Sequence, residues 1–385
     1  MITRRVPSYA CAWSHFMNTR VVNSILLTAL LAAVPTLAHA QSSLTIGQDA
    51  RAMAMGGAGI GAGISGLANP AVLARGRDIR LQTPRIGLRA GGAIGNIGNL
   101  SDTADFFNKS GTDLDDQVSF LARTYATQNS TFGLNVGTAF QVGSLEIGAS
   151  GVASGKLNPN AALQSWANAG GIGLIPNGAG AEVSGVGVYA LPSVGLGIQL
   201  PAVRMGLGKS APVVKLAVGA RVKLLNAVYS RYEATVFSNG EFTSGPGSEL
   251  GGESNLSRTG IATDIGVTGS TKLLGADWSA GFVTQNFVKP DLTFRDQNNV
   301  LIDPLIQTTT VGVAMRKSGL TLAGDIADFF GRQDMRLGAE QRFGPLALRA
   351  GYSSSRGSTY GIGLFGLDVA FGKGQPLELV KSIRF

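Results

Sequence analysis

Hydrophobic and polar residues alternate along several stretches of the chain, most clearly from Val214 to Leu224. In this stretch, VKLAVGARVKL, apolar residues occupy every even position, and Lys215, Arg221 and Lys223 share the other face. A period of two over this length predicts a long β-strand with one apolar and one polar face. The three cations exclude an ordinary dry core on the polar face.

The same alternation recurs on both sides of short turn signals. The stretch 131–140 is followed by Gly143-Ser144 and returns through 145–149, which predicts a hairpin. Met335–Phe343 and Leu346–Tyr352 flank Gly344-Pro345 in the same way. Further candidate strands are Val194–Leu200, Ile261–Gly269, Trp278–Asn286, Thr309–Met315, Leu320–Ile326, Tyr360–Leu364, Leu367–Phe371 and Leu377–Phe385.

Three segments depart from this pattern. Ser101–Phe107 and Leu114–Ala126 have helical periodicity, with Val118, Leu121 and Tyr125 on one stripe, and we expect an insertion or a plug-associated helix. Ser238–Asn255 is rich in Gly, Ser and Asn and is expected to be an extended loop.

Alternation alone fits either a soluble β-sandwich or a transmembrane barrel, whose apolar face is turned outward to lipid. Strands of about nine to eleven residues match the span of a tilted barrel strand. The chain also ends in an alternating strand whose last residue is Phe385, which resembles the assembly signal of bacterial outer-membrane barrels. We therefore predict an all-β fold: a transmembrane antiparallel β-barrel of about 12–14 strands over residues 78–385.

The first 40 residues are typical of a secretory signal peptide. A basic start is followed by an apolar run, Ile25–Ala33, and by Ala38-His39-Ala40, so cleavage is expected before Gln41. Met17 is an alternative start to Met1, because the segment that follows it is a complete leader. A membrane-anchoring helix would need a longer apolar run.

Removal of this leader limits the available chemistry. Cys11, His15 and His39 all lie within it, so the mature chain has neither cysteine nor histidine. This excludes a Cys/His zinc site, a Ser-His-Asp triad, a thiol nucleophile and disulfides. We assign no catalytic residue, metal or cofactor, and we expect no enzymatic activity. Without Arg4, Arg5 and Arg20 the chain keeps 29 basic and 24 acidic residues, without a cluster that indicates nucleic-acid binding.

Glycine is abundant, with all 55 glycines in the mature 345 residues. Gly61–Gly66 fits the G-x-G-x-x-G pattern of a dinucleotide-binding loop. However, no hydrophobic strand precedes it, Asn69-Pro70 stops a following helix, and Asp78 comes too early for the acidic partner. A dinucleotide site is therefore rejected.

The stretch DARAMAMGGAGIGAGISGLANPAVLA, Asp49–Ala74, resembles the amino-terminal segment of FadL-type barrels, outer-membrane transporters of long-chain fatty acids and other hydrophobic molecules. It is more similar to the PorV and TraF-like families, the latter named after conjugal transfer. The matching residues are Arg51, Met55, Gly56, Gly57, Ala58, Asn69, Pro70 and Ala71, although the acidic residue usual before Asn-Pro-Ala is absent. Segments within 263–372 resemble the carboxy-terminal strands of that family, and Asp102–Ser257 resembles it weakly.

The resemblance implies that residues 41–77 form a hatch inside the barrel. Glycine permits the close backbone approach and repeated turns that a compact plug requires, Pro70 would fix one turn, and Asn69 can bond its own backbone. A disordered glycine-rich leader is the alternative. The implied partners are outer-membrane lipid, the barrel-assembly machinery and small hydrophobic or amphipathic molecules that pass through the barrel.

Two other functions remain open. Relatives with the TraF-like label suggest a scaffold for envelope proteins in secretion or conjugation, and a soluble exported β-protein is the third hypothesis. On the alternating strands, Lys215, Arg221, Lys223, Arg336, Glu340 and Arg349 are expected to line the lumen. They could be charges paired in water, or a binding site for an acid headgroup.

Two acidic groups could suggest other chemistry. Asp113–Asp116 lacks the glycine and distal glutamate of an EF-hand, so we interpret it as a solvated helix start. Asp325 and Asp328 fall on opposite faces of an alternating strand, so a cooperating carboxylate pair is not expected.

Overall fold

The computed structural model describes most of the chain after residue 49. The described residues are 50–64, 68–76, 79–94, 97–109, 114–172, 174–206, 211–236, 242–244, 256–295, 301–355, 357–365, 367–372 and 377–384. The predicted leader, the start of the predicted hatch and Phe385 lie outside them.

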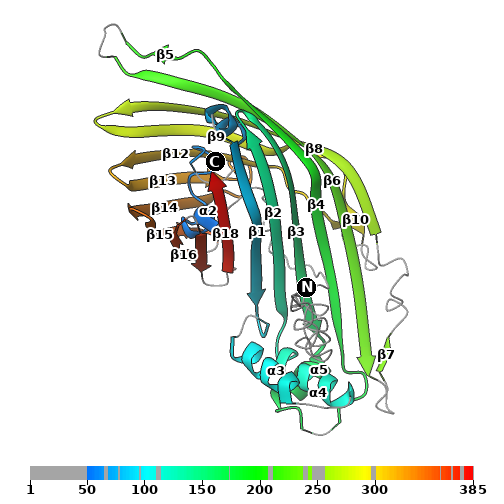
Figure 1. Cartoon of the computed structure of the whole chain (residues 1–385). Coiled ribbons are helices and arrows are strands. Elements are labelled where there is room, and N and C mark those ends of the chain that lie inside the picture. Colours follow the sequence, from blue (N-terminus) through cyan, green and yellow to red (C-terminus); the bar gives the residue numbers. More distant parts are fainter. Residues whose placement is uncertain are drawn as a thin grey trace, which may run out of the picture.

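Strands dominate the described chain (Figure 1). The elements in order are α2 (Ala50–Ala54), η1 (Pro70–Arg75), β1 (Ile79–Gly91), α3 (Ile97–Lys109), α4 (Leu114–Tyr125), β2 (Ser130–Val142), β3 (Leu145–Pro159), α5 (Ala161–Asn168), β4 (Gly180–Gln199), β5 (Val203–Arg204), β6 (Val213–Val236), β7 (Phe242–Ser244), β8 (Leu256–Leu273), β9 (Ala276–Val288), β10 (Phe294–Arg295), β11 (Leu301–Ile302), β12 (Thr308–Lys317), β13 (Leu320–Ala327), β14 (Asp334–Phe343), β15 (Leu346–Ser353), β16 (Gly357–Leu364), β17 (Leu367–Gly372) and β18 (Leu377–Arg384). None of the described helices combines the length and apolar character needed to cross a membrane.

One antiparallel sheet contains sixteen of the described strands. Consecutive long strands pair from β1 to β4 and from β12 to β18, and β6, β8 and β9 connect these two runs. Two further pairings complete this order: β4 pairs with β6, from which the short β5 separates it in the chain, and β18 pairs with the distant β1. Without the short β5 and β7, fourteen of the sheet's described strands take part in this order. The prediction of an all-β antiparallel fold is therefore confirmed.

The predicted strands match observed strands, except that Leu200 lies one residue beyond β4 and Phe385 lies outside the described residues. The strand lengths differ across the sheet. β12 to β18 have six to ten residues, whereas β4 has 20, β6 has 24 and β8 has 18. The expectation of nine to eleven residues is wrong for this long side. Alternation is lost there because the inner face is also apolar, as at Val188, Leu225 and Tyr229. Figure 1 shows the long strands extending toward α3, α4 and α5. β1, which contains Pro84 and three Arg residues, was not predicted.

The predicted helices are confirmed as α3 and α4, which form an insertion between β1 and β2. Their aromatic contact is a stacked Phe106–Phe120 pair, and α4 packs on α5 at the far end of the sheet from α2 (Figure 1). The alternative of a plug-associated helix is therefore wrong. Within the predicted loop Ser238–Asn255, Phe242–Ser244 forms β7 and pairs with β6. The side chains of Asp113–Asp116 and Val118 lie outside the described residues.

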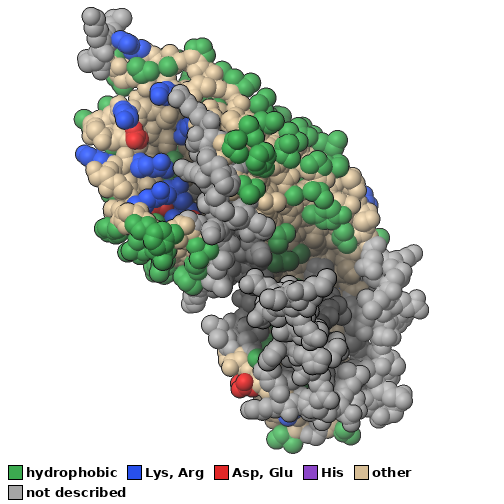
Figure 2. Space-filling model, viewed as in Figure 1, with side chains coloured by type: hydrophobic (Ala, Val, Ile, Leu, Met, Phe, Trp, Pro, Cys, Tyr) green, Lys and Arg blue, Asp and Glu red, His purple; other side chains and the backbone are tan. Residues whose placement is uncertain are grey.

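The two faces of the sheet have opposite polarity, and the apolar face is the exposed one. On β14, Met335 and Leu337 are 60% and 58% exposed, whereas the intervening Arg336 and the following Glu340 are 7% and 1% exposed. The same contrast holds on β6, where Val222 and Leu224 are exposed and Arg221 and Lys223 are buried. Figure 2 shows hydrophobic side chains spread over the visible outer surface. A water-soluble sandwich would have the reverse arrangement.

The inner face changes character along the long strands. Toward α3–α5 it carries a buried apolar cluster from β4, β6 and β8, which includes Val188, Leu225 and Ala262. Leu292, Phe294, Ile302 and Leu305, from the segment that contains β10 and β11, pack against this cluster. Lys289 and Asp303 form an ion pair at the base of that segment. Charged side chains occupy the inner face at the other end of the same strands.

Candidate functional site

The described residues between Ala50 and Gly76, called here the inner segment, lie against the inner face of the sheet. Residues 52–63 are all buried, and so are Ala68 to Ala71 and Leu73. Gly56, Gly57, Gly59 and Gly63 have positive φ, which lets the chain turn repeatedly after α2. Several residues that match the amino-terminal segment of the FadL-type and TraF-like families are buried here: Met55, Gly57, Ala58, Pro70 and Ala71.

Asn69 and Pro70 start η1, as their chemistry predicts. The Asn69 side chain accepts a hydrogen bond from the Ala71 backbone N–H at 3.0 Å, and Pro70 occupies the first turn. The Asn69 amide also donates to the carbonyl of Gly61 at 2.9 Å and to that of Phe282 on β9 at 3.3 Å. One side chain thus caps the helix and connects two parts of the inner segment to the sheet.

Glycines on the strands make room for the backbone of the inner segment. A Cβ added at Gly351 on β15 would overlap with the backbone of Met55 and Gly56. A Cβ at Gly219 on β6 would overlap with the backbone of Pro70, and one at Gly281 on β9 would overlap with Gly61. The high glycine content therefore has a structural cause, because two backbones meet without side chains between them.

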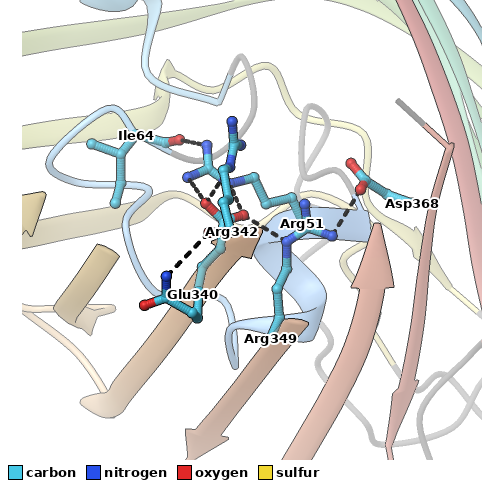
Figure 3. Close-up of polar contacts among 7 residues, drawn as sticks. Arg51, Ile64, Glu340, Arg342, Arg349 and Asp368 are labelled. Carbon is cyan, nitrogen blue, oxygen red and sulfur yellow. Dashed lines mark hydrogen bonds and ion pairs between the residues drawn. The ribbon is translucent and has the colours of Figure 1, made fainter. Parts of the chain in front are cut away.

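Glu340 on β14 is the centre of a buried ionic cluster (Figure 3). Arg51 of the inner segment donates to both Glu340 carboxylate oxygens at 2.8 Å and to the carbonyl of Ile64 at 2.6 Å. Arg342 and Arg349 also donate to Glu340, at 2.9 and 2.7 Å, and Arg349 donates to Asp368 at 2.7 Å. The Glu340 side chain is fully buried. The cluster therefore joins the inner segment to β14 through a bidentate, charge-assisted pair.

Two other side chains of the sheet hold the inner segment. Asp325 on β13 accepts the backbone N–H groups of Ile60 and Gly61 at 2.8 and 3.0 Å. The Thr359 hydroxyl on β16 accepts from the Gly56 N–H at 2.9 Å and donates to the Ala54 carbonyl at 3.2 Å. Asp328 instead lies beyond the end of β13, where its carboxylate accepts from the Arg332 N–H, so the two aspartates do not cooperate.

A second buried cluster surrounds β6. Arg221 donates to Glu146 on β3 at 2.7 Å, and Lys223 donates to Asp264 on β8 at 2.6 Å. Lys223 also donates to the Asn286 side chain at 2.6 Å. These pairs connect strands rather than expose charge, because each cation is at most 3% exposed.

The six predicted lumen residues thus divide into two kinds. Arg221, Lys223, Glu340 and Arg349 are buried in the clusters above, and Arg336 is paired with Asp334 at 2.7 Å. Lys215 is exposed and lines a cavity at the sheet end where β8 turns into β9. Sequence reasoning missed the partners Glu146, Asp264, Thr359, Arg342 and Asp368, and it considered Asp325 only as half of a carboxylate pair. Among the described residues, no group of three His, Cys, Asp or Glu side chains converges as a metal site would require.

We predict that Gly351→Ala destabilises the protein by about 1–3 kcal/mol, because the new methyl group overlaps with the backbone of Met55 and Gly56. Gly324→Ala on β13 is the matched control, since its nearest neighbour would be Leu337 Cδ2 at 3.5 Å, an ordinary contact. Urea unfolding of the refolded protein measures both. Equal midpoints for the two variants would contradict the close backbone packing.

We also predict that Glu340→Gln lowers the free energy of unfolding by about 3–5 kcal/mol, because it leaves three arginines without their shared carboxylate in a buried site. Asp277→Asn breaks an exposed pair with Lys272 at 3.8 Å and should cost less than about 1 kcal/mol. The same unfolding experiment compares the two. A small effect at Glu340 would show that the cluster is not held in the folded state.

Comparisons with known proteins give a family match over part of the chain and several structural likenesses, two of which are described here. Residues 195–327, about a third of the chain, match the family described as "F plasmid transfer operon, TraF, protein". This match begins inside the stretch where the resemblance was weak. No curated protein matches the chain. A "TodX monoaromatic hydrocarbon channel deltaS2 mutant" is 14% identical, with 88% of this chain and 97% of that chain covered and a TM-score of 0.39. A structure titled "Asymmetric conductivity of engineered proteins" is 13% identical, with 80% and 99% covered and a TM-score of 0.24.

Proposed function

We propose that this protein is an outer-membrane β-barrel that passes small hydrophobic or amphipathic molecules by diffusion, with residues 41–77 as its plug. The observation that carries the proposal is the inverted polarity of the sheet. Large apolar side chains such as Leu337 and Ile362 are exposed on the outer face, and charged side chains such as Glu340 are buried on the inner face. Lipid is the environment that stabilises this arrangement.

The strand order supports closure into a cylinder. A membrane cannot hold an open sheet edge, because unpaired backbone groups have no water to bond in the hydrocarbon region. The pairings of β4 with β6 and of β18 with β1 supply partners for strands that would otherwise be edges. An even number of antiparallel strands, such as the fourteen described here, is usual in bacterial barrels of this kind.

The attachment of the inner segment supports a role as a displaceable plug. The polar contacts described above hold it at four places on the sheet: Glu340, Asp325, Thr359 and the carbonyl of Phe282. No covalent bond fixes it other than its own chain. Loss of one contact therefore shifts the equilibrium between the closed and the displaced states without unfolding the barrel. We propose a non-catalytic role and an exported protein whose leader ends near Ala40.

We predict that Arg51→Gln raises the flux of a neutral apolar solute into proteoliposomes by roughly tenfold, the factor for ~1.4 kcal/mol of lost attachment. Arg342→Gln is the matched control: it also removes one arginine from Glu340, but Arg342 lies on the same strand as Glu340 and does not attach the plug. Its flux should stay near the wild-type value. Deletion of residues 42–77 should raise the flux further. Unchanged flux after this deletion would contradict the role of these residues as a plug.

The lipid-facing surface gives a separate prediction. Leu337→Arg places a charge in the middle of β14 on the exposed face and should destabilise the protein in lipid by ~2–4 kcal/mol. Gln341→Arg, on the same face near the end of that strand, should cost at most ~1 kcal/mol. Reversible unfolding from lipid vesicles measures the difference. If Leu337→Arg makes the protein soluble and equally stable without detergent, the outer face is not in lipid.

A scaffold for envelope proteins in secretion or conjugation is the second candidate. The observation that favours it is the match of residues 195–327 to the TraF family of the F plasmid transfer operon. Affinity purification from detergent extracts distinguishes the two functions. A stable protein partner together with no solute flux, even after deletion of the plug, would favour the scaffold.

A further inference from the structure

A cavity of about 580 Å³ lies at the sheet end where short turns join β8 to β9 and β12 to β13. Two parts of the chain form its walls. Ile64 and Arg75 belong to the inner segment, and the remaining lining comes from the start of β6 and from the adjoining ends of β8, β9, β12 and β13. Figure 2 shows Lys and Arg side chains gathered over the ends of the short strands.

The strand register arranges the sheet side of this cavity in two rows on the inner face. The outermost row consists of Lys272 on β8, Asp277 on β9, Arg316 on β12 and Thr321 on β13. The next row consists of Lys215 on β6, Ser270 on β8, Ser279 on β9 and Ala314 on β12. Residues directly opposite each other have Cβ atoms about 4.5–5.5 Å apart. Neighbours in a row can therefore bind one small group together.

Ala314 identifies the face on which these rows lie. It packs in a buried cluster with Met55 and Ala62 of the inner segment. Trp278 and Met315 also border the cavity, but they alternate with the residues of the two rows and are paired with each other. Their side chains therefore belong to the outer face, and the inner-face side chains that remain on the sheet side are mainly cations and hydroxyls.

The cavity carries more positive than negative charge. Four cations line it, Arg75, Lys215, Lys272 and Arg316, with Asp277 as the acidic residue among the described lining. Asp277 forms an exposed ion pair with Lys272 at 3.8 Å. Within the described part of the chain, no carboxylate forms an ion pair with Arg75, Lys215 or Arg316. Like charges from the inner segment and from the sheet thus line the same cavity.

Glu340 is the nearest further carboxylate in the outermost row, since it lies opposite Thr321 on β14. It already accepts two hydrogen bonds from Arg51 and one each from Arg342 and Arg349. A carboxylate has about four lone-pair sites, so these donors leave no capacity for Arg316. The exposed Arg316 guanidinium can therefore donate to an incoming anion.

The donors around the cavity match an anion with several acceptor oxygens. A phosphate group carries a charge of about −1.5 to −2 at pH 7 and three strong acceptor oxygens. It can therefore contact cations on several strands at once, with the hydroxyls of Ser270 and Ser279 between Lys215 and the cations of the outermost row. A carboxylate has two oxygens and a single charge, so it would leave most of these donors without a partner. Arginine and lysine are also the side chains that bind phosphate in proteins.

We propose that this cavity binds a phosphate group, held by Lys215, Lys272 and Arg316 of the sheet and by Arg75 of the inner segment. The inference goes beyond the proposed function, because binding requires no passage of a solute. A free phosphate ion and the phosphate of a lipid headgroup share this chemistry. Arg221 and Lys223 lie on the same face of β6 as Lys215 but are paired and buried, so they take no part.

Isothermal titration calorimetry of the full mature protein in an uncharged detergent tests the proposal. The probes are inorganic phosphate, dihexanoyl phosphatidic acid below its micelle concentration, and acetate. We expect saturable binding of one or both phosphate probes, much weaker binding of acetate, and loss of affinity as salt screens the exposed cations. Binding of phosphatidic acid alone would identify a lipid headgroup as the source, and tighter or equal binding of inorganic phosphate would identify the free ion. Acetate binding as tight as that of phosphate would overturn the proposal.

The variants Lys215→Gln and Arg316→Gln should each weaken phosphate binding by about fivefold, the effect of removing one partly exposed charge contact. Lys317→Gln is the matched control, since Lys317 neighbours Arg316 but does not line the cavity. Asp277→Asn should instead strengthen binding by roughly twofold to fivefold, because it removes the opposing charge and releases Lys272. Unchanged affinity in the Lys215→Gln/Arg316→Gln double variant, or weaker binding in Asp277→Asn, would overturn the proposal.

Arg75 makes the site depend on the position of the inner segment. A ligand that contacts both Arg75 and the sheet stabilises the state in which the two lie together. Saturating phosphate should therefore lower the flux of a neutral apolar solute, and Arg75→Gln should reduce both this effect and the affinity. The flux effect rests on the proposed function. If phosphate binds as described but no solute passes even after deletion of residues 42–77, the transport function fails and the site remains supported. If solute passes and phosphate does not bind, the site fails and the transport function stands.

Discussion

The direct approach of two backbones, that of the inner segment and that of the sheet, is the constraint on which the rest of the structure depends. At Gly351, Gly219 and Gly281 a single methyl group would overlap with main-chain atoms of the inner segment. This contact explains why the chain has so many glycines and why the inner segment needs glycines of its own to turn. Glycine in strands is costly, since it weakens them through conformational entropy. The burial of the inner segment against these strands offsets that cost. Because the inner segment has few large side chains, it can be buried only where the two backbones come close.

Buried charge is the second consequence of an interior that is not a hydrophobic core. Glu340, Asp264 and Arg221 are almost fully buried, and each has partners on other strands or on the inner segment. Removing one partner of such a pair leaves an uncompensated charge in a low-dielectric environment, which destabilises far more than the pair itself stabilises. The clusters thus specify which strands are neighbours and where Arg51 must lie. An apolar interior could not provide this specificity, since the apolar surface of the chain is already on the outside.

The sequence predicts the strands well because alternation is a local property. β6, β14 and β15 follow directly from the positions of their apolar residues, and α3 and α4 follow from helical periodicity. The partners of the charged residues could not be predicted, because they depend on register between distant strands. Arg51 and Glu340 are 289 positions apart, and only the pairing of the strands brings them together. Lys215 shares the alternation of Arg221 and Lys223, yet its location near the strand end leaves it exposed. No local pattern distinguishes these three residues.

Ionic and apolar stretches alternate along the inner face of the long strands. Toward α3–α5, β4, β6 and β8 carry an apolar stretch that is covered by Leu292, Phe294, Ile302 and Leu305, and beyond it Arg231 pairs with Glu182 at 3.0 Å. Toward the other end of β6 the lining changes to the paired Arg221 and Lys223, and then to the exposed Lys215 at the cavity. A hydrated ion would lose its water at the apolar end, and a purely apolar molecule would gain nothing from the cations. Under the proposed transport function, a solute would therefore meet both ionic and apolar surface along the inner face.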